Sequence, residues 1–385
     1  MIERRTKEDK PVLAICYDFD RTLSPDEMQA QGFIQSVGCD VKEFWDESNE
    51  LAKEQGMDQN LAYMLKMLEK AKGNVWPTRK NLADYGAKVK LFDGVEEWFE
   101  RIRAYGKEHG VIVEHYIISS GLKEMIEGTS IARNKAFEQI YACSYYYDKE
   151  GVAQWPAQVV NYTNKTQFLF RIEKGMLDPN DQGVNNPIAP EKMRVPFRNI
   201  VYIGDSDTDI PCMKLVNSYG GHSIAVYAPR VGDKSKVHKM MREGRVKYYA
   251  AADYREGYQL DLLVKSIIER TAANETLENI YYERKKETAE FDRRSGGHQT
   301  KTRAMQELEE SGNFANTHTV IAKLGRISKW TPEEIDELCR IAFNNGQVSY
   351  ILTDADIADF FTKVIGTTDV ITPNIKKMKE RLKLD

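Results

Sequence analysis

A short acidic run directly after an apolar stretch is the feature that most constrains this chain. Residues 12–17, Val-Leu-Ala-Ile-Cys-Tyr, are followed at once by the run Asp18-Phe19-Asp20-Arg21-Thr22. A continuous apolar stretch of this length predicts a strand buried on both faces, as in a parallel sheet. Two carboxylates at the end of such a strand repel each other unless a cation joins them. The run therefore predicts a metal-assisted site at the carboxyl end of the first strand.

Length and composition predict a globular protein of two or three domains. The chain has 385 residues, of which 41% are hydrophobic and 30% charged, and its net charge is −4. At roughly 100–200 residues per domain, this length allows two or three domains. The composition allows a buried core beneath a polar surface. The slightly negative charge argues against general affinity for nucleic acid, although it does not exclude a local basic patch.

The N-terminal residues and the cysteines indicate a cytoplasmic protein. Residues 1–10 are charged and lack the apolar segment of a secretory signal. No apolar run approaches the roughly 20 residues that a membrane-spanning helix needs. The five cysteines are scattered, and none belongs to a CxxC pair. We therefore expect reduced thiols, a cytoplasmic location, no membrane contact and no zinc site.

Alternating strands and helices organise the first 270 residues. This alternation predicts an α/β fold with a mostly parallel sheet, whose ligand site lies at the carboxyl edge. Residues 25–90 show helical periodicity without a convincing strand, so we expect an inserted helical cap in which Asp40 begins a helix. The catalytic core then comprises residues 10–24 and 91–270. Within it, the patterns predict strands over 111–118, 141–147, 199–203 and 223–228, and a long surface loop over 175–198.

Residues 271–385 have a different character and predict a helical C-terminal region of unknown role. Residues 279–294 are highly charged and predict a solvated helix, and a hinge is expected at 295–298. Thr331-Pro332-Glu333-Glu334 combines a Thr cap, a Pro at the first helical position and acids in the first turn. This region is a candidate for contact with a protein partner.

Four groups of polar residues follow one another in a characteristic order. They are the run 18–22, Ser119 after an apolar stretch, Lys165 at a helix start, and Gly204-Asp205-Ser206-Asp207-Thr208-Asp209 after another apolar stretch. Each group alone has a plain structural explanation, such as an acidic turn, a helix cap, a solvated lysine or a calcium-like loop. Their combination is far more specific than any one of them.

This order and spacing resembles the haloacid dehalogenase superfamily of phosphohydrolases over about residues 11–270. The run 18–22 matches its first motif, Ser119 its second, Lys165 its third, and Asp205 through Asp209 its fourth. The helical insertion and the hairpin-like segment before the lysine are similar to the phosphoserine-phosphatase branch. The resemblance implies a Rossmann-like, three-layer α/β/α core, a helical cap after the first strand and a helical C-terminal extension.

The resemblance also implies Mg²⁺-dependent hydrolysis of a small phosphorylated metabolite. Asp18 would attack phosphorus and form an aspartyl-phosphate, and Asp20 would act as general acid and then as base. Mg²⁺ would offset the repulsion between the phosphate and the anionic nucleophile. The implied phosphate-binding residues are Thr22, Ser119 and Lys165, and the implied metal site comprises Asp18, Asp205, Asp209 and the backbone carbonyl of Asp20.

Three residues depart from the family pattern or match it weakly. Arg21 occupies a position that is usually small, and its side chain either points toward the cap or substrate or pairs with Asp26 or Glu27. Glu27 stands where phosphoserine phosphatases have a substrate-binding glutamate. Arg79 is the candidate for the arginine that the family's cap contributes. Phosphoserine itself is therefore an open choice of substrate.

Other interpretations of the same residues stay open. A phosphotransferase or phosphomutase would share the aspartyl-phosphate, and a regulatory protein could use its C-terminal helices to recognise a partner or a nucleic-acid end. The cluster Tyr145-Tyr146-Tyr147 could stack on a base, but a strand packed on both faces is the favoured interpretation. The basic residues 376–383 are explained by favourable charge at a helix C-terminus, without nucleic acid.

Overall fold

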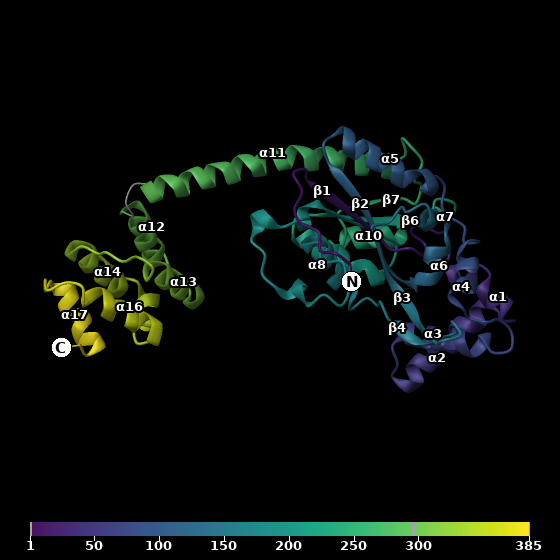
Figure 1. Ribbon diagram of the computed structural model, residues 1–385, viewed down its shortest axis with the longest axis horizontal. Coiled ribbons are helices and arrows are strands. Elements are labelled where there is room, and N and C mark those ends of the chain that lie inside the picture. Colours follow the sequence, from purple (N-terminus) through teal and green to yellow (C-terminus); the bar gives the residue numbers. More distant parts are fainter. Residues whose placement is uncertain (1, 295–297, 385) are drawn as a thin grey trace. The chain divides into compact units, whose positions relative to one another are not determined.

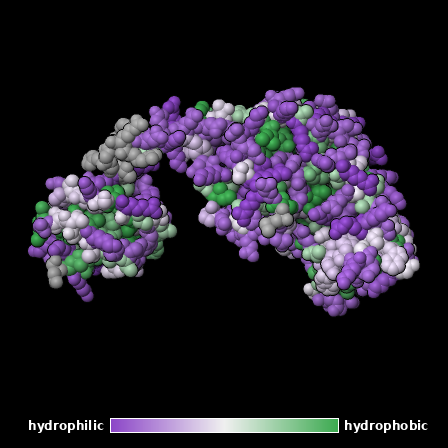
Figure 2. Space-filling view, viewed as in Figure 1, coloured by the Kyte–Doolittle hydropathy of each residue, from purple (hydrophilic) through white to green (hydrophobic). Residues whose placement is uncertain are grey.

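The computed structural model describes residues 2–294 and 298–384, which form two compact units (Figure 1). The first unit ends at Glu278 and the second begins at Asn279. Each unit has its own hydrophobic core, one built from buried side chains between Val12 and Ile268 and the other from buried side chains between Ala304 and Met378. Hydrophilic residues cover most of the face in view, and hydrophobic residues occur there in separate small patches (Figure 2).

A single mixed sheet organises the first unit. In the described part of the chain it has seven strands in the order β4-β3-β2-β1-β5-β6-β7. Neighbouring strands pair in parallel, except for the antiparallel pair of β3 and β4. The expectation of a mostly parallel sheet is therefore confirmed. The strands are β1 (Val12–Tyr17), β2 (Ile112–Leu122), β3 (Gln139–Tyr147), β4 (Ala153–Gln158), β5 (Ile200–Gly204), β6 (His222–Tyr227) and β7 (Tyr248–Ala251).

Helices cover both faces of the sheet and complete the three layers. The chain moves from β1 to β3 in one direction and from β5 to β7 in the other, so right-handed crossovers place the two sets of connecting helices on opposite faces. On one face, Arg101 of α5 pairs with Asp261 of α11 at 3.3 Å. On the other face, α8 packs against α9. The helices are α5 (Val95–Glu108), α6 (Lys123–Gly128), α7 (Ser130–Arg133), α8 (Lys165–Lys174), α9 (Ile210–Ser218), α10 (Ser235–Arg242) and α11 (Gln259–Arg294).

The predicted cap is present as a set of helices between β1 and α5. As expected, Asp40 begins a helix, because its carboxylate accepts hydrogen bonds from the amides of Lys42 and Glu43. The hairpin of β3 and β4 reaches the same helices, where the Tyr145 hydroxyl donates to the Met64 carbonyl at 2.7 Å. The cap elements are η1 (Met28–Ala30), α1 (Phe33–Ser36), α2 (Val41–Gln55), α3 (Gln59–Ala71) and α4 (Arg79–Gly86).

The C-terminal region is helical, as its sequence predicts. The charged segment 279–294 is the second half of α11. Thr331 caps α14 with a capping box to Glu334, which confirms the expected helix start. Residues 295–297 of the predicted hinge lie outside the described residues. The helices are α12 (His298–Glu309), α13 (Phe314–Leu324), α14 (Pro332–Asn344), α15 (Gly346–Tyr350), α16 (Ala355–Ile365) and α17 (Pro373–Leu382).

Two predictions about local structure are wrong in part. Tyr145 is buried, but Tyr146 is 58% exposed, because side chains alternate along the strand and α3 covers one face of the hairpin. Residues 175–198 are not simply a surface loop. They contain the short 3₁₀ helices η2 (Gln182–Asn185), η3 (Pro190–Lys192) and the start of η4 (Phe197–Asn199), and buried Arg194 pairs there with Glu114 at 2.7 Å.

Candidate active site

The first motif is a tight loop that begins where β1 ends. The Asp18 amide donates to the carbonyl of Ile203 in β5 at 3.0 Å, which continues the pairing of the two strands. The Phe19 carbonyl then accepts hydrogen bonds from the amides of Leu23 and Ser24 at 2.9 and 3.1 Å, while the Phe19 side chain is fully buried. This loop holds the predicted carboxylates at the carboxyl edge of the sheet, where open α/β sheets bind ligands.

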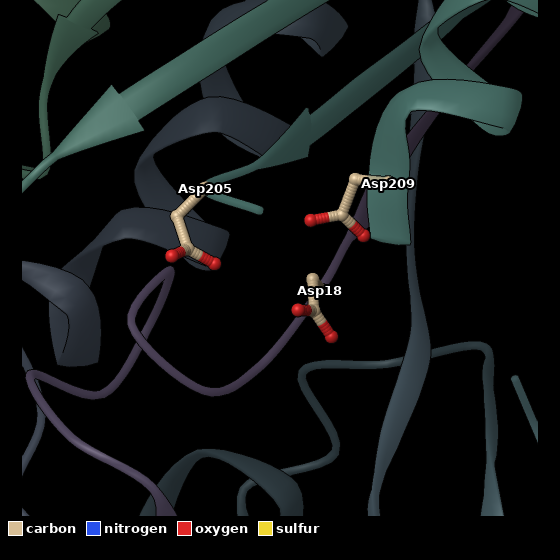
Figure 3. Close-up of side chains that lie close together, drawn as sticks. All are labelled: Asp18, Asp205 and Asp209. Atoms are coloured by element: carbon tan, nitrogen blue, oxygen red, sulfur yellow. The ribbon is translucent and has the colours of Figure 1, made fainter. Parts of the chain in front are cut away.

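Three carboxylates converge at this edge (Figure 3). Asp18 follows β1, Asp205 follows β5, and Asp209 immediately precedes α9. Each contributes one oxygen, and these oxygens lie within 4.8 Å of one another. The family resemblance implied that these three residues lie together, and the structure brings them together at the carboxyl edge of the sheet.

Lys165 is buried between two of these carboxylates. Its Nζ lies 2.8 Å from Asp209 Oδ1 and 3.4 Å from Asp18 Oδ1, and the lysine side chain has no exposed surface. Burial by itself lowers the pKa of Lys165, but the charges of Asp18 and Asp209 outweigh it and raise the pKa above its ordinary value. The lysine is therefore a charged ammonium that offsets part of the negative charge of the cluster.

Asp209 is held by donors on both of its oxygens. Oδ1 accepts from the Tyr202 hydroxyl at 2.9 Å in addition to Lys165, and Oδ2 accepts from the amide and hydroxyl of Ser206 at 3.1 and 2.9 Å. Gly204 makes room for this arrangement, because a Cβ there would lie 2.5 Å from Asp209 Oδ2. Asp209 is thus a fixed anchor for Lys165 with little capacity for further ligands.

Asp18 and Asp205 are better suited to hold a metal ion. Burial raises the pKa of Asp18 to about 6, and burial together with the charges of Asp209 and Asp18 raises that of Asp205 to about 7. The Oδ1 atom of Asp18 is buried and accepts no hydrogen bond from the described residues. Carboxylate oxygens are the ligands that Mg²⁺ prefers, and a divalent cation would remove their mutual repulsion. The residues present therefore fit a divalent cation.

Asp20 has a different environment from the other acids. Its Oδ1 accepts a hydrogen bond from the Met28 amide at 2.9 Å, and its carboxylate is not part of the three-residue metal group. Burial, followed by the nearby charge of Asp18, raises the pKa of Asp20 well above its ordinary value. A carboxyl group whose environment favours its protonated form is suited to act as a general acid.

A pocket of about 240 Å³ opens over these acids. Asp18, Asp20 and Asp205 lie in its lining, together with residues of the cap and of α10. The cap is fixed beside the pocket, because the Tyr63 hydroxyl of α3 donates to the Ser120 carbonyl at 2.8 Å. The cap and α10 contribute Gln29, Trp45, Asn60, Tyr63 and Lys236 to the lining.

The predicted phosphate-binding residues differ in whether they reach the surface of the pocket. Ser119 lines the pocket, and its Oγ accepts a hydrogen bond from the Gly121 amide at 3.1 Å. Thr22 and Lys165 are fully buried and are not part of the lining. The Thr22 hydroxyl has no hydrogen-bond partner among the described residues. Ser119 is thus the member of this group that the structure places at the pocket surface.

The structure shows the contacts of the three residues that depart from the family pattern or match it weakly, Arg21, Glu27 and Arg79. Arg21 pairs with Glu27 at 3.0 Å, and both line the pocket. Arg79 lies elsewhere, against Glu124 at 3.8 Å and over the ring of Tyr147 at 4.5 Å. The interpretation of Arg79 as the cap arginine of the pocket is therefore wrong, because α4 directs its charge toward α6 and β3.

Sequence reasoning missed five lining residues that lie outside the motifs. Four lie on cap helices, Gln29, Trp45, Asn60 and Tyr63, and Lys236 lies on α10. None belongs to a motif, and helical periodicity distinguishes buried from exposed faces without showing which residues border a pocket. The one available signal was the position of the cap itself, which predicts that some of its residues face the acids.

A model of the haloacid dehalogenase-like hydrolases matches residues 15–214. The chain belongs to this family. The matched segment spans more than half of the 385 residues and contains all of the acids described above. The expectations of this superfamily and of a hydrolytic enzyme are therefore confirmed.

Individual proteins similar to the chain include one curated relative and several solved structures. An uncharacterized protein of Borreliella burgdorferi is 27% identical over 278 residues, which are 66% of this chain and 95% of the relative. A hydrolase of the haloacid dehalogenase family from Salmonella enterica serovar Typhi is 17% identical, covering 68% of this chain and 73% of its own, with a TM-score of 0.45. A probable phosphoserine phosphatase from Vibrio cholerae is 16% identical, covering 69% and 67%, with a TM-score of 0.45.

Among the described residues, none of the helices combines the length and the apolar character that crossing a membrane requires.

Proposed function

We propose that this protein is a divalent-metal-dependent phosphomonoester hydrolase that works through an aspartyl-phosphate on Asp18. The observation that supports the proposal most directly is the pairing of two unlike carboxyl groups at one pocket. Asp18 lies beside the buried Lys165 ammonium and within reach of Asp205, whereas the Asp20 carboxylate makes no salt bridge with a described residue, accepts a hydrogen bond from the Met28 amide, and has a pKa that burial raises. One acid is thus suited to attack and the other to donate a proton.

In the first step an Asp18 oxygen attacks the phosphorus of the substrate, and the bond from phosphorus to the leaving oxygen breaks. The Asp20 carboxyl group gives its proton to that oxygen, so the leaving group departs as a neutral alcohol. The buried Lys165 ammonium and the Ser119 hydroxyl stabilise the negative charge on the phosphoryl oxygens. Asp20 is left as a carboxylate.

In the second step water attacks the phosphorus of the aspartyl-phosphate, and the Asp20 carboxylate takes a proton from that water. The bond between phosphorus and Asp18 breaks, which releases inorganic phosphate and restores both carboxyl groups. A divalent cation held by Asp18, Asp205 and the backbone carbonyl of Asp20 would supply charge neutralisation. Asp209 keeps Lys165 in place during both steps through the 2.8 Å ion pair.

The pocket volume of about 240 Å³ supports a small phosphorylated molecule as substrate. The proposal is tested by turnover of a generic aryl phosphate with added Mg²⁺, followed by release of inorganic phosphate. Asp18→Asn should abolish turnover, because the amide is a far poorer nucleophile. Asp207→Asn, the same change at an exposed position outside the pocket lining, is the matched control. Full activity of Asp18→Asn would exclude the proposed nucleophile.

A further inference from the structure

Two cations at the mouth of the pocket have no part in the proposed chemistry. Arg21 lines the pocket from the loop after β1, and Lys236 lines it from α10. Both side chains are exposed to solvent. The same pocket is lined by Asp18, the proposed nucleophile, and by Asp20, the proposed general acid. A phosphomonoester bound to these acids would therefore have Arg21 and Lys236 as neighbours.

The acids of the mouth do not balance these cations. Apart from Asp18, Asp20 and Asp205, the only acid among the described lining residues is Glu27. Arg21 already pairs with Glu27 at 3.0 Å. Within the described chain, Lys236 has no acidic partner at salt-bridge distance. Outside the three acids at the catalytic edge, the described lining therefore has one positive charge in excess, and its remaining carboxylate, Glu27, is already paired with Arg21.

The backbone of Arg21 has a conformation that is unfavourable for an arginine. Its φ is 58°, in the left-handed region that glycine adopts without steric cost and other residues adopt at about 1 kcal/mol or more. A glycine at this position would adopt the same backbone conformation without that steric cost. The arginine instead places a guanidinium in the pocket lining, one residue after Asp20, the proposed proton donor to the leaving oxygen.

We infer that the pocket selects phosphomonoesters whose leaving group has a second anionic group, a carboxylate or a phosphate, which Lys236 and Arg21 bind. This inference rests on the proposed phosphatase function and names the substrate class of the same site. Guanidinium and ammonium groups bind both kinds of anion through charge-assisted hydrogen bonds. Binding of a leaving group with an ammonium is disfavoured, because Lys236 repels that charge and the Glu27 carboxylate is already paired with Arg21.

Three substrates with the same two-carbon leaving group test the inference. Phosphoglycolate ends in a carboxylate, phosphoethanolamine in an ammonium, and ethyl phosphate in a methyl group. Ethylene glycol bisphosphate tests whether a phosphate serves as well as a carboxylate. We expect kcat/KM to be highest for the two anionic substrates and lowest for phosphoethanolamine. The difference between leaving-group reactivities cancels when each variant is compared with the wild-type protein on the same substrate.

Lys236→Gln should lower the ratio of kcat/KM for phosphoglycolate to that for ethyl phosphate by about tenfold, the effect of losing one charge-assisted contact. Lys239→Gln is the matched control, because Lys239 is exposed on the same helix and does not line the pocket. Glu27→Gln releases Arg21 and should raise the same ratio. If Glu27 instead binds a substrate ammonium, Glu27→Gln will lower turnover of phosphoethanolamine and the inference is overturned.

Binding of non-hydrolysable analogues separates the inference from the proposed function. Calorimetry with Mg²⁺ should show tighter binding of 3-phosphonopropionate than of propylphosphonate or 3-aminopropylphosphonate, and Lys236→Gln should remove the preference. Equal affinities for the three, or equal losses for all three in Lys236→Gln, would overturn the inference even in an active phosphatase. Absence of turnover for every phosphomonoester, with the binding preference intact, would overturn the proposed function alone.

Discussion

The Lys165 ammonium lies 2.8 Å from a carboxylate oxygen of Asp209, and neither side chain is exposed to solvent. Breaking a buried pair by removing one partner leaves an uncompensated charge and costs about 3–5 kcal/mol. Lys165→Met should therefore lower the free energy of unfolding by about this amount and reduce turnover at least 100-fold. The double variant with Asp209→Asn should lose much less stability than the two single losses together. If denaturant unfolding shows that the double variant loses the sum of the two single losses in free energy, the Lys165 and Asp209 charges do not stabilise each other.

A second prediction concerns the divalent cation. Asp205→Asn should raise the Mg²⁺ concentration for half-maximal turnover by about tenfold or more, because an amide is a weaker ligand than a carboxylate. Asp207→Asn should change it little, since Asp207 is exposed and lies outside the carboxylate group. Titration with Mg²⁺ after treatment with a chelator measures both values. Full turnover in the presence of the chelator would contradict the requirement for the metal.

A third prediction concerns acid sensitivity and His222. Burial, with the charges of Lys247 and Arg270, lowers the pKa of His222 to about 4. Between the ordinary value near 6.5 and 4 the unfolded chain binds a proton that the folded chain does not, so stability falls as the pH falls through this window. The loss is on the order of 3 kcal/mol at the lower end. His222→Phe should flatten this dependence in denaturant unfolding, whereas His109→Gln, at an exposed site, should leave it unchanged.

A fourth prediction follows from the two separate cores. Leu338 is fully buried in the core of the C-terminal unit, and that core shares no described residue with the core of the first unit. Leu338→Ala should cost about 2–5 kcal/mol in the C-terminal unit. Scanning calorimetry of the full chain should show one transition shifted to lower temperature and the other unchanged. A uniform shift of all the unfolding heat would show that the units unfold together.

The sequence predicted the acidic site because its chemistry follows strand ends. Asp18 and Asp205 come directly after buried apolar strands, and parallel pairing of β1 with β5 places such residues at one edge. The cap was predicted from helical periodicity and from its position between strands. Local patterns were sufficient here because each depends on a few consecutive residues.

Other features depend on tertiary arrangement and were missed. Strand β7 is four residues long, and apolar and polar residues do not alternate along it, so only its pairing with β6 reveals it. Trp45 and Lys236 come from helices far apart in the sequence and meet at the pocket through folding alone. The pairing of Arg21 with Glu27 was one of two alternatives, and choosing between them required the direction of a side chain on a left-handed backbone.

The cap is tied to the core in two places, through Tyr63 to Ser120 and through Tyr145 to Met64. Tyr63 and Met64 are neighbours on α3, so the two hydrogen bonds hold the same turn of this helix, one from the carboxyl end of β2 and the other from β3. The part of the cap that borders the acids is therefore anchored to the core, and we expect a small phosphomonoester to reach Asp18 more readily than a phosphate group carried on a macromolecule, because the pocket has a volume of about 240 Å³.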